Sequence, residues 1–387
     1  MTTDKQPIVN SDALKAFFEK KGVDSGDPAV SDTVKELEAI IAEKIRVQRN
    51  KNRIVKNDSE KEQELATDVL SEAQIAKLPT WVRNQIDGAL VIGSSKQVIQ
   101  TPDGKKYHLG NTLNELPGGE WTFFLNSVIN TRYPTSGPES YAHSIRKIHP
   151  SPKPPQLMRQ LIEFFTKENE IVLDYFMGVG GTLLGASLCN RRALGIDLNS
   201  EYISTYLEAS KELELKPQKA ILGDSIKLLN QKDSEIQSFL DGEKVSLILI
   251  DPPYGDMMSR PKTGESAKKK MDTAPTPYTD SGDDLGNMNL EDFFPVFNDS
   301  VETASKLLKD KGHVVVFIKD LQPNGENTNL LHARMIEDLN KIEGLQYLGM
   351  KIWADQGVNL YPYGYPYSFV SNQIHQYILI FRKRDAK

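Results

Sequence analysis

The sequence predicts an α/β protein whose central sheet is mostly parallel and is covered by helices on both faces. Short aliphatic segments alternate with helix-like stretches from about residue 139 to the end of the 387-residue chain. Acidic residues follow several of these segments, and a glycine-rich loop follows the first. Because open sheets bind ligands at the carboxyl ends of their strands, we expect these acids to line one site.

Three regions are expected along the chain. Residues 1–75 are polar, with apolar residues three and four apart after Ser31, a spacing typical of a small helical N-terminal extension. Residues 76–138 form a connecting region, in which "TPDG" between two strand-like pieces predicts a hairpin. The main domain is residues 139–387. Its strands are expected at 170–174, 193–197, 245–250, 313–318 and 374–381.

The composition is that of a globular protein, with 39% hydrophobic residues. Cys189 is the single cysteine, which excludes an internal disulfide and a cysteine-based zinc site. No apolar stretch is long enough to span a bilayer, and the N-terminus lacks the pattern of a signal peptide. We therefore expect a soluble cytoplasmic protein that contacts no membrane and holds no metal.

The formal net charge of −6 conceals three basic runs. They are residues 43–56, residues 143–160, and a third run made of Arg260, Lys262, Lys268, Lys269 and Lys270. A basic run is either a solvated face or a patch that binds the phosphates of a nucleic acid.

The segment "ILIDPPYGD", residues 248–256, ends a continuous aliphatic run with an acid, two prolines and a tyrosine. Val245 to Ile250 has the pattern of a central strand that is buried on both faces. The prolines prevent further pairing, so Asp251 and Tyr254 are expected at the carboxyl end of this strand. Taken alone, an ordinary turn with an incidental acid explains the motif equally well.

A second motif lies upstream, in "IVLDYFMGVGGTLLGASLCNRRALGIDL". A strand ends at Asp174, a glycine loop follows, and the next strand ends at Asp197, an arrangement typical of a nucleoside-cofactor site. Asp224 and Ser225 follow a further strand and are suited to an adenine amino group. Leu183 replaces the third glycine of a dinucleotide fingerprint and disfavours a nicotinamide enzyme. Unrelated strand-end acids are the alternative explanation.

With a third motif, His149-Pro150-Ser151-Pro152-Lys153-Pro154, the chain resembles the amino-group DNA methyltransferases over residues 139–387. This resemblance implies a Rossmann-like seven-stranded sheet and S-adenosylmethionine as cofactor. Tyr175 and Gly181 depart from the usual proline and threonine of the glycine motif, and the motif order is permuted relative to the group that carries the histidine motif. It implies that the cofactor is bound by His149, Pro150, Lys153, Asp174, Phe176, Met177, Gly178, Gly180, Thr182, Asp197, Asp224 and Ser225.

The catalytic residues implied are Asp251, Pro252, Pro253 and Tyr254. An exocyclic amine is a poor nucleophile, so the Asp251 carboxylate and the Pro252 carbonyl are expected to accept its hydrogens, and Tyr254 to stack on the base. The base must be flipped out of a duplex or be single-stranded. An acid at position 251 favours adenine N6. The alternatives are cytosine N4, RNA guanine N2, and a catalytically silent binding subunit of a methyltransferase pair.

The expected partners are DNA and a restriction or other defence-system protein. The 260–270 run, the N-terminal region and the aromatic segment from Tyr361 to Tyr367 are the candidates for contact with DNA.

Overall fold

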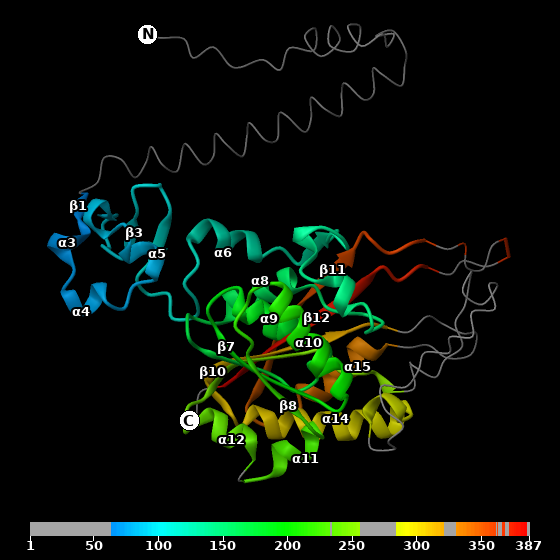
Figure 1. Ribbon diagram of the computed structural model, residues 1–387. Coiled ribbons are helices and arrows are strands. Elements are labelled where there is room, and N and C mark those ends of the chain that lie inside the picture. Colours follow the sequence, from blue (N-terminus) through cyan, green and yellow to red (C-terminus); the bar gives the residue numbers. More distant parts are fainter. Residues whose placement is uncertain are drawn as a thin grey trace, which may run out of the picture. The chain divides into compact units, whose positions relative to one another are not determined.

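The computed structural model describes residues 63–232, 234–255, 284–320, 330–360, 362, 366–367 and 371–384 (Figure 1). The chain forms two compact units, with the boundary between Leu109 and Gly110. Residues 110–138 therefore belong to the larger unit, together with the region expected at 139–387. Within the described residues, no helix combines the length and the apolar character needed to cross a bilayer.

The first unit contains a four-stranded antiparallel sheet in the order β1-β2-β3-β4. The hairpin expected around "TPDG" joins β3 to β4, and Gly104 takes the positive φ of 84° that its turn requires. The elements are β1 (Glu64–Leu65), α3 (Ala66–Val69), α4 (Glu72–Ile75), α5 (Thr80–Arg83), the 3-10 turn η1 (Ile86–Gly88), β2 (Leu90–Ile92), β3 (Val98–Gln100) and β4 (Lys106–His108).

The second unit is built on a sheet in the order β5-β11-β12-β10-β9-β6-β7-β8. The strands are β5 (Val128–Thr131), β6 (Ile171–Asp174), β7 (Arg192–Asp197), β8 (Lys219–Leu222), β9 (Val245–Ile250), β10 (Leu308–Ile318), β11 (Leu345–Asp355) and β12 (His375–Lys383). Only β12 runs antiparallel to its neighbours. The α/β class and the Rossmann-like arrangement predicted from the sequence are confirmed, but the described sheet has eight strands.

The additional strand is β5, from the region expected to be a connection. It pairs in parallel with the C-terminal residues of β11, Ile352 to Asp355. Lys351 of β11 holds it there, because its ammonium donates to the carbonyls of Phe124 and Asn126 just before the strand. A four-residue strand at an edge carries little periodicity of its own, which is why the sequence did not reveal it.

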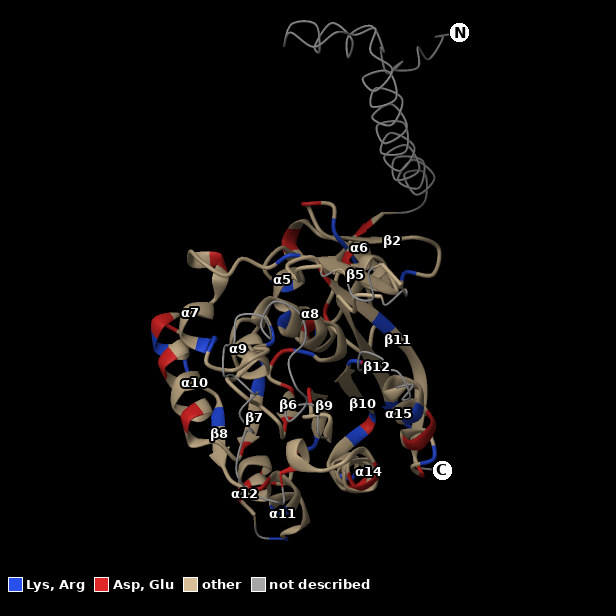
Figure 2. Cartoon of the chain, turned by 90° about the vertical axis from the view of Figure 1, so that its right-hand side faces the viewer, with Lys and Arg blue, Asp and Glu red and all other residues tan. Residues whose placement is uncertain are grey.

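Helices cover both faces of this sheet, as Figures 1 and 2 show. On β9, Leu247 and Leu249 pack on one side with helices α8, α9 and α10, while Ile248 and Ile250 pack on the other with α11, α12, α14 and α15. This explains the continuous aliphatic run of the strand. The helices are α6 (Gly118–Phe124), α7 (His143–Arg146), α8 (Pro155–Phe165), α9 (Gly181–Ser187), α10 (Ser200–Glu212), α11 (Ser225–Asn230), α12 (Glu235–Leu240), α14 (Leu290–Ser305) and α15 (Leu331–Leu339), with 3-10 turns η2 (Pro138–Ser140) and η4 (Leu285–Asn287).

Candidate active site

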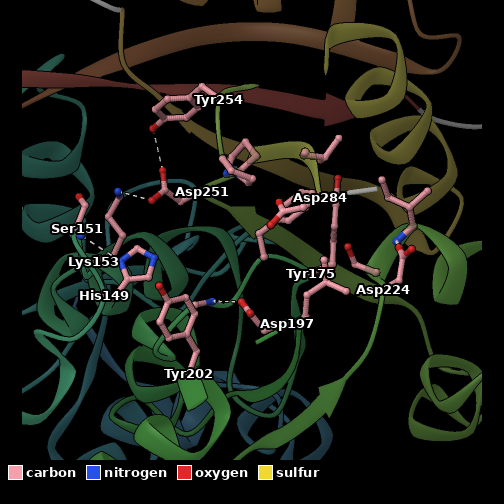
Figure 3. Close-up of a pocket in the computed structure, with 18 of the residues that line it drawn as sticks. His149, Ser151, Lys153, Tyr175, Asp197, Tyr202, Asp224, Asp251, Tyr254 and Asp284 are labelled. Carbon is pink, nitrogen blue, oxygen red and sulfur yellow. Dashed lines mark hydrogen bonds and ion pairs between the residues drawn. The ribbon is translucent and has the colours of Figure 1, made fainter. Parts of the chain in front are cut away.

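A cavity of about 280 Å³ lies at the carboxyl edge of the sheet, where β6, β7, β8 and β9 end (Figure 3). It contains most of the residues that the sequence singled out. Those lining it are His149, Lys153, Phe176, Gly178, Asp197, Asp224, Ser225, Asp251, Pro252, Pro253 and Tyr254. The two motifs, 73 residues apart at Gly178 and Asp251 (251 − 178), therefore open into one space.

The glycine loop connects β6 to α9 and depends on two left-handed residues. Gly178 and Gly180 have φ angles of 49° and 74°. A Cβ on Gly180 would lie 2.2 Å from the Tyr206 ring of α10, so a side chain there would force the loop off the helix. Gly180 thus serves packing rather than the lining of the cavity.

Asp197, the last residue of β7, faces the cavity and is held by the loop. Its carboxylate accepts hydrogen bonds from the backbone N–H of Gly178 at 2.8 Å and of Asn199 at 2.9 Å. Burial raises its pKa to about 6, although these two hydrogen bonds act in the opposite direction. Its remaining acceptor capacity is available to a ligand in the cavity.

Asp174 lies behind the loop instead of in the large cavity. It is 3% exposed, and its carboxylate accepts from the Phe176 N–H and the Thr182 hydroxyl. With Met177 and Thr182 it lines a smaller hollow of about 30 Å³. Direct binding of the cofactor by all three stays a prediction; in the structure Asp174 and Thr182 contact each other, and Asp174 also holds the loop. Burial raises the pKa of Asp174 to about 7.

The two departures from the usual glycine motif have structural explanations. The Tyr175 hydroxyl lies 3.3 Å from that of Ser300, which ties the loop to α14. A Cβ on Gly181 would lie 2.8 Å from the Lys153 carbonyl, so this position has no room for a threonine. Thr182, one residue later, provides the hydroxyl.

The segment His149 to Pro154 packs against the loop through Arg146. This arginine is 1% exposed, and it donates to the carbonyls of Val179 at 3.2 Å and of Lys153 at 2.5 Å. Burial lowers its pKa to about 10. The basic run at 143–160 is therefore not simply a charged surface, because Arg146 and Lys153 are buried. Pro150 of the same segment lines a neighbouring cavity of about 310 Å³.

His149 itself is neutral near pH 7, because burial lowers its pKa to about 4. Its Nδ1 accepts from the Ser151 N–H at 3.1 Å, and its ring lies 5.0 Å from that of Tyr202.

Asp251 directly follows β9, and both of its carboxylate oxygens are engaged (Figure 3). The Lys153 ammonium pairs with Oδ2, and the Tyr254 hydroxyl donates to Oδ1 at 3.0 Å. Tyr254 is 4% exposed. Its stacking on a base remains a prediction, whereas its contact with Asp251 was not foreseen.

Comparison with known proteins identifies the family. The sequence model of an N6/N4 methyltransferase family, described as "DNA methylase", matches residues 15–208. The chain belongs to this DNA methylase family. S-adenosylmethionine is therefore its cofactor.

Several curated relatives align over parts of the methylase. A tRNA (guanine(10)-N2)-dimethyltransferase of Methanocaldococcus jannaschii is 32% identical over 167 residues, which are 42% of this chain and 45% of that protein. The Type II methyltransferase M1.MboII of Moraxella bovis is 33% identical over 72 residues, 19% of this chain and 28% of its own length. The chain thus spans less than half the length of these two relatives. TrmN from Thermus thermophilus superposes with a TM-score of 0.40 and 16% identity, covering 64% of this chain and 54% of that one.

The cavity of the methylase fits the adenosine part of this cofactor. Carboxylate acceptors at Asp197 and Asp224 match the hydroxyls of a ribose and the amino group of an adenine. Phe176, Leu198 and Ile226 add apolar surface. Asp224 also caps α11 by accepting from two backbone N–H groups, and pairs with Lys227 at 3.1 Å.

Several residues that line the cavity were not assigned to the site from the sequence. They are Ser151, Tyr175, Leu198, Tyr202, Ile226, Asp284, Leu285, Lys319 and Gln376. Lys319 directly follows β10, so the strand-end rule could have found it, but we applied that rule only to acids. Ser151, Lys319 and Gln376 also line a neighbouring cavity of about 310 Å³.

The predicted contacts with nucleic acid lie mostly outside the described residues. This holds for Arg260, Lys262, Lys268, Lys269 and Lys270, for the basic run at 43–56, and for most of the segment from Tyr361 to Tyr367.

Replacing Asp197 by Ala is expected to weaken S-adenosylmethionine binding by roughly 1–3 kcal/mol, because it removes charge-assisted hydrogen bonds. Isothermal titration calorimetry measures this. Asp299→Ala on the exposed side of α14 is the matched control and should bind as the wild type does. Equal affinities for both variants would remove Asp197 from the cofactor site.

Asp174 should make the fold less stable as pH rises. Its pKa of about 7 in the folded chain lies above the value of about 3.9 in an unfolded chain, so its favourable contribution is complete below pH ~4 and is lost by pH ~7. Asp174→Asn removes this loss. Thermal unfolding at pH 5 and pH 8 should show the melting temperature of the variant rising relative to the wild type at the higher pH, and a constant difference would contradict this assignment.

Proposed function

We propose that this methylase transfers a methyl group from S-adenosylmethionine to the exocyclic N6 of adenine in DNA, at a specific site and on a flipped or single-stranded base. The observation that carries the proposal is the shared cavity: the Asp251-Pro252-Pro253-Tyr254 turn opens into the space that contains the glycine loop and Asp197. The DNA methylase family and the aligned Type II methyltransferases support DNA as the substrate.

The protein's own groups act by orienting the exocyclic amine of the target base. Its two hydrogens are donated to the Asp251 carboxylate and the Pro252 carbonyl, which localises the nitrogen lone pair. The two prolines keep both acceptors in position after the strand ends. S-adenosylmethionine, when bound, supplies the electrophilic methyl group. The amine would lose one proton on methylation, and Asp251 is an acceptor for that proton in the cavity.

A second candidate is methylation of guanine N2 in RNA. The alignment with tRNA (guanine(10)-N2)-dimethyltransferases of Methanocaldococcus jannaschii and Pyrococcus abyssi favours it. The target is again an exocyclic amine beside a ring nitrogen, so the same two acceptors would serve. The residues that contact the base decide between the two, and the acceptors of the amine do not.

Identification of the product separates these possibilities. The full chain is incubated with labelled S-adenosylmethionine and either duplex DNA, single-stranded DNA or tRNA transcripts, and the nucleosides are then analysed by mass. N6-methyladenine supports the proposal. N4-methylcytosine or N2-methylguanine would replace it by the corresponding alternative, and the absence of any product would indicate a silent binding subunit.

Asp251→Ala should abolish methyl transfer and retain cofactor binding, because its proposed role is to hold the amine. The rate of product formation and calorimetry on the same preparation measure the two properties, with Asp299→Ala as the control. Methylation at the wild-type rate would exclude Asp251 from the reaction.

We also propose that the basic run at 260–270, which follows the catalytic motif in the sequence, contacts DNA phosphates. Neutralising Lys268, Lys269 and Lys270 together should weaken binding to all DNA sequences and reduce the salt dependence by about two to three phosphate contacts. Fluorescence anisotropy at several salt concentrations measures this. An unchanged salt slope would move the recognition role to the N-terminal region. A defence-system partner remains a proposal from family resemblance.

A further inference from the structure

Lys153 has a partner that the proposed chemistry does not need. Its side chain is 7% exposed, and its ammonium lies 5.2 Å from the Phe317 ring centroid and pairs with Asp251 Oδ2. Both ions of this pair are largely withdrawn from water, and each would be unfavourable there without the other. Loss of either partner would therefore leave the other ion buried and unpaired.

The same pair opposes the proposed reaction. As the amine attacks, positive charge develops on its nitrogen, and the Asp251 carboxylate is the group that can stabilise this charge. A cation at Oδ2 cancels much of that effect, and it occupies one of the two oxygens to which the amine would donate. With Tyr254 on Oδ1, departure of Lys153 from Oδ2 would leave that oxygen and its negative charge to the target amine.

Lys153 also lines the small hollow beside the glycine loop, together with Gly178 and Val179. It is the cation of that hollow among the described residues, since His149 has a pKa of about 4 and is neutral. The hollow is also lined by the carboxyl groups of Asp174 and Asp251, so Lys153 is the group there that can offset the charge of an incoming anion. S-adenosylmethionine carries one such group, the α-carboxylate of its amino-acid part.

Resting on the proposed function, we propose that Lys153 is a movable counter-ion, which pairs with Asp251 in the empty cavity and with the cofactor carboxylate in the occupied one. Occupation of the cofactor site thereby releases Asp251 Oδ2 to accept the target amine. The positioning of the base is then coupled to the presence of the cofactor. Asp251 and the cofactor carboxylate compete for one ammonium.

This competition can be measured without nucleic acid. The probes are S-adenosylhomocysteine, which carries the carboxylate but no sulfonium charge, and 5′-methylthioadenosine, which lacks the amino-acid part. Asp251→Asn keeps the size of the side chain and removes the competing charge. It should tighten binding of S-adenosylhomocysteine by about three- to tenfold, in the range of one ion pair, and leave 5′-methylthioadenosine unchanged. Lys153→Met should weaken only S-adenosylhomocysteine, and in that background Asp251→Asn should have no further effect.

Calorimetry on the four chains completes the cycle, with thermal unfolding to verify that each is folded. If Lys153→Met does not fold, the comparison of the two probes in Asp251→Asn still decides. The inference is overturned if Asp251→Asn leaves S-adenosylhomocysteine affinity unchanged or alters both probes equally. In those cases both probes still bind, and the proposed function survives. Failure of both probes to bind the wild type would instead reject the cofactor site itself.

Discussion

The site depends on the parallel pairing of β6 with β7 on one side and with β9 on the other. This pairing brings Asp174, Asp197 and Asp251 to one edge of the sheet, although β9 ends more than fifty residues after β7. The interior of each strand is buried and apolar, so the hydrophobic effect that buries these strands also brings their polar ends together. The acids are thus withdrawn from water by the sheet that positions them.

Buried cations compensate for this concentration of acids. Arg146 joins the glycine loop to the His149 segment through two backbone carbonyls, and Lys153 on that segment then reaches Asp251. Burial raises the pKa values of Asp174 and Asp197, because a carboxylate withdrawn from water is costly to ionise. A cofactor with a cationic sulfonium suits such a site, because its charge complements the remaining acids.

Binding of the cofactor and choice of the substrate base depend on different groups of the protein. The proposed cofactor site consists of a glycine loop and strand-end acids, and relatives named for tRNA and for DNA modification both align with this chain. Substrate choice relies on the groups that contact the base and its phosphates. Among the described residues, Lys319 and Gln376 stand where the catalytic cavity meets its neighbour, which makes them the first candidates for contact with a nucleotide.

The sequence by itself determined the features that are local in the chain. Strand periodicity, prolines that stop a strand, and glycines in a tight loop placed β6, β7, β9, β10 and β12, the acids at strand ends, and the β3–β4 hairpin within a few residues. Only the tertiary structure decided the contacts between distant segments. These are the ion pair of Lys153 with Asp251, the packing of the Tyr206 ring against Gly180, and the pairing of β5 with β11. Local patterns record whether a residue is buried and in which conformation. They carry no information on which partner, many residues away, meets it there.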